Sequence, residues 1–400
     1  NGQLAVRRMM SATLSGDPGA GMNKAGESIA GGFEATGQAL SETVQVPVKA
    51  AEVYEYQRPI RALGMGGVYI PFVSDTDAPY VNPAALAYVE AISWKVFSLD
   101  FGAGIAGFSN PTDVQSLTTP TTAADYIQFF GKKVTVNAFG ASTLTLPYFG
   151  ISFFDELYSS AVMHTPAFPA LNAKFINDYG GVIATGFPIA PLISAGIAVK
   201  RINRWGGSQT LGLGSLAEAT SFTNNFADKG IGHGIDGALM FRAPMLLQPT
   251  LALVWKDVGD TSFVMTEGTA PPEAIKSNLA AAFGSKLDLP GLDISAGLEY
   301  RHIMNNTLQL GQKLHIGGEI SLPMIDLRAG LYQGYPSYGV GLDLLLLQFN
   351  AAYYGIETGG YPGQSRMDRV QVGVQMEFSL DANFNFYDKN GKRRKIRQRR

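Results

Sequence analysis

The feature that most limits the fold is an alternation of apolar and polar residues that recurs through the second half of the chain. It is clearest in Leu292–Arg301 (LDISAGLEYR), and Lys313–Leu322, Ile325–Gln333 and Val370–Phe386 repeat it. Successive side chains of a strand point to opposite faces, so each segment has one apolar and one polar face. The pattern predicts antiparallel β-sheet with two chemically different sides.

Alternation by itself fits two folds, a sandwich in water and a barrel in a membrane. Composition favours the membrane, because only 16% of the residues are charged, against roughly 25% in an average soluble domain. The chain also approaches its end on alternating aromatic residues, Phe378, Phe384 and Phe386. In lipid, a closed barrel is the only sheet that satisfies all of its backbone hydrogen bonds. We therefore predict an all-β transmembrane barrel in a bacterial outer membrane.

Segments with this pattern, separated by turn residues, number about fourteen. The uncharged run Tyr179–Val199 is predicted to form two strands joined at Phe187–Pro191, because its prolines would break a helix. Short turns at one end and long loops at the other are typical of such barrels, and an even strand count places both termini in the periplasm. The predicted strands start near Ile92, Lys133, Tyr148, Leu171, Leu192, Gly230, Pro249, Ile275, Leu292, Lys313, Ile325, Tyr338, Leu347 and Arg369.

The barrel is one of four predicted parts. Residues 1–56, rich in Ala, Gly, Ser and Glu, form an extension that is either a flexible periplasmic end or part of a plug. Residues 57–91 hold a glycine-rich plug segment with a short helix, residues 92–387 form the barrel, and residues 388–400 form a basic periplasmic tail. Two long loops, Ser109–Lys132 and Gly206–Lys229, are expected to hold short helices at Ala123–Phe130 and Ser215–Ala227.

The stretch Arg61–Ala87 (RALGMGGVYIPFVSDTDAPYVNPAALA) has the most distinctive local chemistry. Its glycines allow positive φ or close backbone approach, and an Asn-Pro pair predicts a short helix over about Pro83–Glu90. A phosphate loop is disfavoured, because the Lys-Ser/Thr of such loops does not follow. The two aspartates are interpreted as an acidic loop, since too few oxygen donors are present for calcium. The candidate plug residues are Gly64, Gly66, Gly67, Asp75, Asp77, Asn82 and Pro83.

This stretch resembles the N-terminal signature of the FadL-like outer-membrane superfamily, which includes fatty-acid transporters and the PorV and PorQ secretion proteins. The matching residues are Ala62–Gly67, Asp75–Ala78 and Asn82–Leu86, with Ala85 where the family usually has Gly. Gly330–Leu344 looks like the PorV-type branch. The resemblance covers roughly residues 61–386 and implies a fourteen-stranded barrel that either passes hydrophobic molecules or binds protein partners.

Both functions remain open from the sequence. A transporter needs an apolar path and an exit through the wall, for which Val162–Leu171 with its two prolines is the candidate. A PorV-like partner or scaffold for a secretion, motility or other envelope complex fits a charged lumen better than a tunnel does. The charged residues predicted to face the lumen are Asp293, Glu299, Arg301, Lys313, Glu319, Asp326, Arg328 and Glu377.

The tail carries seven basic residues in its last nine positions, which leaves an acidic body of net charge −9, from −2 minus 7. Such a tail is suited to anionic lipid or an acidic partner. The expected partners are outer-membrane lipid and lipopolysaccharide, a hydrophobic ligand, and envelope proteins that contact the N-terminal segment and the tail. The tail residues expected to make such contacts are Lys392, Arg393, Arg394, Lys395 and Arg397.

Other classes of function have little support in the sequence. The tail lacks the interleaved aromatics of nucleic-acid binding segments. The four histidines show no metal-ligand spacing and no nucleophile elbow occurs, so neither an enzyme nor a cofactor is expected. With no cysteine, disulfides and thiolate metal sites are excluded.

Overall fold

The computed structural model describes residues 58–73, 75–106, 130–164, 170–212, 226–344, 346–359 and 363–381. The predicted N-terminal extension, the basic tail and most of the two loops expected to hold helices lie outside these residues.

Within these described residues, fifteen strands make one sheet. The first eight are β1 (Ala91–Ala106), β2 (Lys133–Leu146), β3 (Phe149–His164), β4 (Ala170–Ala190), β5 (Ile193–Gly212), β6 (Lys229–Arg242), β7 (Thr250–Lys256) and β8 (Phe263–Glu267). The others are β9 (Asn278–Leu289), β10 (Leu292–Tyr300), β11 (Leu314–Ser321), β12 (Ile325–Tyr332), β13 (Tyr335–Leu344), β14 (Leu347–Glu357) and β15 (Arg366–Asp381). The helices are α3 (Ile60–Gly64), α4 (Ala78–Val81), the 3₁₀-helix η1 (Pro83–Tyr88) and α9 (Leu310–Lys313).

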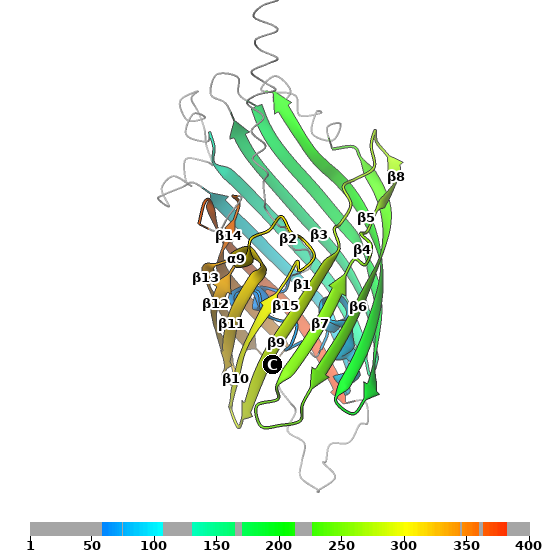
Figure 1. The fold of residues 1–400 in the computed structure, drawn as a ribbon, viewed down its shortest axis with the longest axis vertical. Helices are drawn as coiled ribbons and strands as arrows, with labels where there is room; N and C mark the ends of the chain where they lie inside the picture. Colours follow the sequence, from blue (N-terminus) through cyan, green and yellow to red (C-terminus); the bar gives the residue numbers. More distant parts are fainter. Residues whose placement is uncertain are drawn as a thin grey trace, which may run out of the picture. The chain divides into compact units, whose positions relative to one another are not determined.

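The sheet closes into a barrel. Apart from β8, each strand pairs antiparallel with the strands before and after it in the ring, and β7 pairs with β9. β1 pairs with β15 along its length and β5 pairs with β6, so the order returns to its start. Fourteen strands form the ring and β8 is an extra one. The predicted barrel is thus confirmed, and its strands begin within a few residues of the predicted starts. Figure 1 shows that β2–β5 rise well beyond the short strands β9–β13.

The extra strand divides one position in the wall between two segments. β7 pairs with the second half of β6 and β8 pairs with its first residues, so both lie along the same neighbour. Between them the chain turns, with positive φ at Asp257, Gly259 and Asp260. The sequence predicted a single strand from Pro249, because nothing in the apolar alternation marks this interruption.

The two faces of the wall are reversed relative to a protein in water. On β10, Leu298 is 41% exposed, whereas Glu299 and the adjoining Arg301 are 0% exposed. Ile294, Ile316 and Leu327 are likewise exposed on the outside. An apolar outer band around a polar interior is what a lipid environment requires. No helix within the described residues is long and apolar enough to cross a membrane.

Connections at one rim are short, as predicted: β2–β3, β4–β5, β9–β10 and β13–β14 join through two residues each. The predicted split of Tyr179–Val199 into two strands is confirmed, since β4 ends at Ala190 and β5 starts at Ile193. The ends of the candidate exit, Val162–His164 and Ala170–Leu171, pair across β3 and β4, and its two prolines lie outside the described residues.

The outer apolar band makes a testable prediction. Leu298→Arg places a cation on the lipid face near the middle of β10, and should lower the free energy of unfolding by about 2–4 kcal/mol. Leu310→Arg is the control, because Leu310 begins α9 in the β10–β11 connection and is 66% exposed. It should cost at most about 1 kcal/mol. Urea unfolding in phospholipid vesicles measures both, and equal losses would contradict the assigned faces.

Candidate functional site

Residues 58–90, here called the inner segment, precede β1 and lie within the ring of strands (Figure 1, blue). Residue 74 in this segment lies outside the described residues. α3 contacts β12–β15 on one side of the lumen, whereas η1 contacts β4–β6 on the other. The segment therefore spans the barrel interior from wall to wall.

Glycines let the segment touch the wall backbone to backbone. A Cβ on Gly64 would lie 2.8 Å from the Cα of Gly339 on β13. At Gly66, where φ is +66°, a Cβ would lie 2.3 Å from the carbonyl oxygen of Ile316 on β11. Gly67 also has positive φ, and a Cβ there would lie 2.8 Å from His315 Nδ1. No side chain larger than hydrogen fits these positions without displacing the wall.

A buried ion pair at the end of β10, between Glu299 and Arg301, binds the backbone from Gly67 to Ile70. Glu299 accepts hydrogen bonds from the backbone N–H groups of Tyr69 (2.5 Å) and Ile70 (2.6 Å). Arg301 donates to the carbonyl of Gly67 and pairs with Glu299 at 2.6 Å. Because both ions are fully buried, these hydrogen bonds replace the water that the charges lose. The two residues predicted to face the lumen thus hold the inner segment.

A second network joins α3 to β11 and β12. Arg61 donates to both oxygens of Glu319, at 2.5 and 2.9 Å, in a bidentate pair. Arg328 donates to Glu319 (2.6 Å), to Asp326 (2.8 Å) and to the side chain of Asn350 (2.8 Å). Planar guanidinium groups suit such shared contacts. This network crosslinks the segment to three strands.

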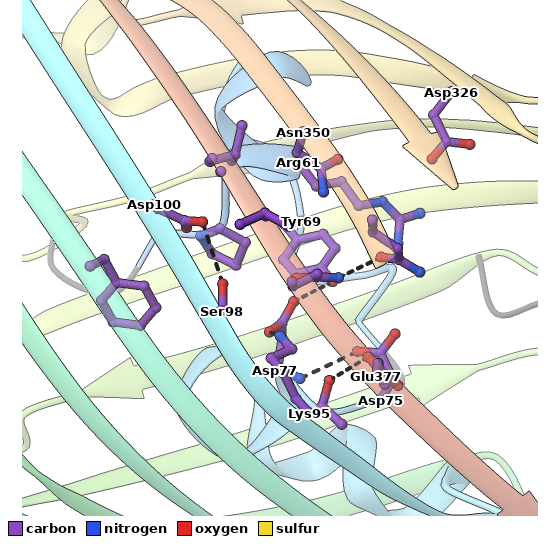
Figure 2. Close-up of a pocket in the computed structure, with 18 of the residues that line it drawn as sticks. Arg61, Tyr69, Asp75, Asp77, Lys95, Ser98, Asp100, Asp326, Asn350 and Glu377 are labelled. Carbon is purple, nitrogen blue, oxygen red and sulfur yellow. Dashed lines mark hydrogen bonds and ion pairs between the residues drawn. The ribbon is translucent and has the colours of Figure 1, made fainter. Parts of the chain in front are cut away.

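Asp77 is the centre of a third contact, shown in Figure 2. Its carboxylate accepts hydrogen bonds from Tyr69 (2.9 Å) and Tyr80 within the segment, and pairs with Lys95 of β1. Burial raises the pKa of Asp77, but the charge of Lys95 and hydrogen bonds from Lys95, Tyr80 and Tyr69 outweigh it, so the pKa is lowered. The carboxylate therefore stays ionised and ties the segment to the first strand.

Asn82 caps the helix predicted from the Asn-Pro pair. Its Oδ1 accepts from the backbone N–H of Ala84 at 3.2 Å, and its Nδ2 donates to the carbonyl of Ile70 at 3.2 Å. The helix starts at Pro83 as predicted, but it is a 3₁₀-helix and ends at Tyr88 rather than near Glu90. η1 packs so closely on β4 and β5 that a Cβ on Gly186 or Gly196 would overlap the segment backbone.

Two small cavities remain around the segment. The larger, of about 50 Å³, lies between the segment and β1 and β12–β15, and the smaller, of about 30 Å³, lies near Arg58, Glu156 and Arg369. Ligand pockets for organic molecules usually measure roughly 300–1,000 Å³. These two cavities have room for a few water molecules only.

The lumen beside β3–β9 also holds an apolar cluster. Its buried residues on the wall and the segment include Tyr69, Val73, Leu86, Phe154, Val182, Ala198, Ile202, Met240, Val254 and Phe263. Buried ion pairs lie on the same strands, between Arg204 and Asp178 and between Lys200 and Asp236. The sequence-based description of the lumen as charged is therefore incomplete, because it rested on the alternation of the late strands.

The remaining predicted residues lie nearer the ends of the strands. Glu377 accepts a hydrogen bond from Thr76 at 2.9 Å and lines the larger cavity together with Asp75. Asp293 pairs with Lys286 at 3.2 Å. Lys313 ends α9 and lies over the ring of Tyr300, at 5.8 Å from its centroid. The five basic tail residues lie outside the described residues.

Sequence reasoning missed four residues that hold the segment, namely Arg61, Tyr69, Tyr80 and Lys95. Lys95 had a detectable signal, because it is a lone cation among apolar residues of the first strand. The two tyrosines had none, since their role depends on which way the segment turns inside the barrel.

Comparison with known proteins places the fold. No family model matches the chain, and no curated protein matches it in sequence. Among solved structures, the CymD monoaromatic hydrocarbon channel superposes with a TM-score of 0.50 at 10% identity, over 80% of this chain and 97% of that chain. The toluene transporter TbuX of Ralstonia pickettii reaches 0.47 at 10% identity, over 79% and 97%. The toluene transporter TodX of Pseudomonas putida reaches 0.46 at 10% identity, over 83% and 99%.

The likeness to CymD shows a shared fold, and the predicted FadL-like barrel is confirmed at that level. The likeness to CymD does not support the PorV-like alternative.

Close packing of the segment predicts the effect of a single methyl group. Gly66→Ala should destabilise the protein more than Gly291→Ala, because both residues have positive φ but only Gly66 has wall backbone in reach. Alanine in the left-handed conformation should lower the free energy of unfolding by about 1–2 kcal/mol at either site. Overlap with the wall should lower it by roughly a further 1–3 kcal/mol at Gly66. Urea unfolding measures the loss. The rate of trypsin cleavage after Arg61 reports whether the segment leaves the wall. Equal losses of stability and equal cleavage rates in the two variants would contradict the close packing of Gly66 on the wall.

The contact at Asp77 makes a pH prediction. In the wild type its lowered pKa stabilises the fold above the ordinary pKa of an aspartate, about 3.9, and this contribution is lost as the pH falls through the lowered value. Lys95→Met should cost about 3–5 kcal/mol at neutral pH, because it leaves a buried charge without its partner. In that variant burial raises the Asp77 pKa, so stability should increase on acidification instead.

The double variant Lys95→Met/Asp77→Asn is the control, because it removes both charges and keeps an acceptor for Tyr69 and Tyr80. It should regain most of the stability at neutral pH and lose the dependence on pH. Thermal unfolding across acidic and neutral pH tests both statements. A double variant no more stable than Lys95→Met would show that the ion pair does not hold the segment.

Proposed function

We propose that this protein passes small hydrophobic molecules across the bacterial outer membrane, with the inner segment as the plug that closes the barrel. The observation that carries the proposal is the apolar cluster that buried residues of β3–β9 form with η1 and its neighbours. Such a surface can exchange contacts with the plug for contacts with an apolar cargo at little cost. The shared fold with CymD, a monoaromatic hydrocarbon channel by its title, supports the same class of cargo.

The two sides of the plug differ in what opening would break. The α3 side is bound by buried ion pairs, such as Arg61–Glu319 and Arg301–Glu299, and leaving a buried charge unpaired costs about 3–5 kcal/mol. The η1 side is held mainly by apolar packing, with one backbone hydrogen bond from Tyr148 to the carbonyl of Leu86 and with Arg242 over the ring of Tyr88. We infer that the plug opens on the η1 side while α3 stays attached, because non-directional apolar contacts are the ones that cargo can replace.

The orientation in the membrane follows from the rims. Ala91 at the start of β1 pairs with Asp381 at the end of β15, so the first strand begins and the last strand ends at the rim that carries the short turns. Short turns are periplasmic in such barrels. We infer that both termini are periplasmic, where the basic tail would meet the anionic head groups of the inner leaflet.

The proposal is tested by uptake of radiolabelled toluene into Gram-negative cells that express the barrel. Expression should raise the initial uptake rate several-fold. Ile202→Asn should remove most of this increase, because it places an amide in the apolar cluster beside η1. Ile356→Asn is the matched control, since Ile356 is equally buried but lies on β14 beside α3. Uptake rates are divided by the amount of folded barrel in each strain. This amount is measured on SDS gels, where an unboiled folded barrel migrates differently from a boiled one.

Two outcomes would contradict the proposal. Cells with the wild-type barrel could take up toluene no faster than cells without it. Alternatively, the two variants could reduce uptake equally, which would mean that general damage to the barrel, and not loss of an apolar path, explains the effect.

A further inference from the structure

Two polar side chains lie on the outside of the wall, just beyond the apolar band. Arg201 of β5 and His233 of β6 are both exposed and are directly opposite each other across the two strands. Two residues nearer the short turns, the same strands carry Val199 and Ile235, which are 51% and 54% exposed. Residues two apart on a strand share a face, so all four side chains point away from the lumen.

The position of this pair along the strand matches the edge of a membrane. Arg201 lies eight residues after Ile193, the first residue of β5, from 201 minus 193. Eight residues of a strand tilted by about 40° rise roughly 20 Å, close to the height of about 25 Å of the apolar band in such barrels. β10 ends after nine residues, Leu292–Tyr300, so the short strands stop after a similar rise (Figure 1). The pair therefore lies where lipid head groups replace acyl chains.

Neither side chain is satisfied by the protein. Among the described residues, no ion pair or hydrogen bond joins the side chain of Arg201 or His233 to another group. Arg366 of β15 differs, because it pairs with Asp368 at 2.7 Å. A guanidinium donates paired N–H groups that suit a phosphate, and an imidazole offers a further N–H. The two exposed groups are thus free to meet one anion from outside.

The surface around the pair suits the rest of a lipid molecule. In the row of register partners that contains Arg201, β4 contributes Gly181, whose missing side chain leaves the wall low between Arg201 and Phe153 of β3. On the same face of β4, Ile183 is 53% exposed on the side of the short turns, and Tyr179 is 50% exposed on the other side. Tyrosine is enriched at membrane interfaces. The order from apolar to cationic to aromatic is the one that an anionic lipid meets along its length.

We propose that Arg201 and His233 bind a phosphate group of a lipid in the outer leaflet, whose acyl chains lie against Val199, Ile235 and Ile183. The lipid of this kind expected there is the lipid A part of lipopolysaccharide, which carries phosphates on an acylated sugar. The inference rests on the orientation proposed above. It can fail separately from transport, because lipid binding is measured without any cargo.

Binding of purified lipid A to the full chain, refolded from denaturant in detergent, tests the proposal. Native mass spectrometry should count one retained lipid A per chain in the wild type. Thermal unfolding, followed by circular dichroism during the titration, should rise by a few degrees and saturate, as expected for a ligand that binds only the folded state. Lipid A stripped of its phosphates, and sodium phosphate alone, should give neither result.

Variants separate the phosphate contact from general affinity for lipid. Arg201→Gln should weaken binding of lipid A about tenfold or more, as loss of a charge-assisted hydrogen bond does. Adding His233→Gln should weaken it further, and both positions are exposed, so the variants should fold. Arg366→Gln is the matched control, because it removes an arginine that already has a carboxylate partner. It should bind lipid A as the wild type does.

Three results would overturn the proposal. The wild type could retain no lipid A, the lipid without phosphates or sodium phosphate could act as strongly as lipid A, or the double variant could bind lipid A as tightly as the wild type.

Discussion

The whole structure depends on one constraint, that a backbone in lipid has no water to satisfy its hydrogen bonds. An open sheet would leave an unpaired edge on each side, and each unpaired group costs several kcal/mol. Pairing of β1 with β15 and of β5 with β6 removes both edges. Closure then sends one set of alternating side chains to the lipid and the other to the interior, so the polar set has to be satisfied inside.

The inner segment answers that need on one side of the barrel. Glu299 and Arg301 bind its backbone, while Glu319 and Lys95 pair with Arg61 and Asp77 of the segment. Charges that would be costly if buried alone are therefore used as attachment points. The glycines of the segment belong to the same arrangement, because they bring its backbone within reach of these side chains and of the wall.

The opposite end of the segment meets the wall differently. η1 contacts β4–β6 mainly through apolar residues and small residues such as Gly186 and Gly196. Apolar packing lacks direction, whereas ion pairs are directional and hold α3 in register. The proposed opening on the η1 side rests on this difference.

The sequence alone determined the parts of this protein that depend on local periodicity. Alternation located each wall strand, because the two faces of a strand meet chemically different surroundings along its full length, and Asn82-Pro83 marked the start of η1. Tertiary structure decided the division between β7 and β8, the apolar cluster in the lumen and the partners of Asp77. They arise from residues far apart in the chain, such as Lys95 and Asp77 or Gly64 and Gly339, which only closure of the barrel around the segment brings together. Periodicity states which face a residue occupies, whereas the identity of its neighbour across the lumen is set by how the ring closes.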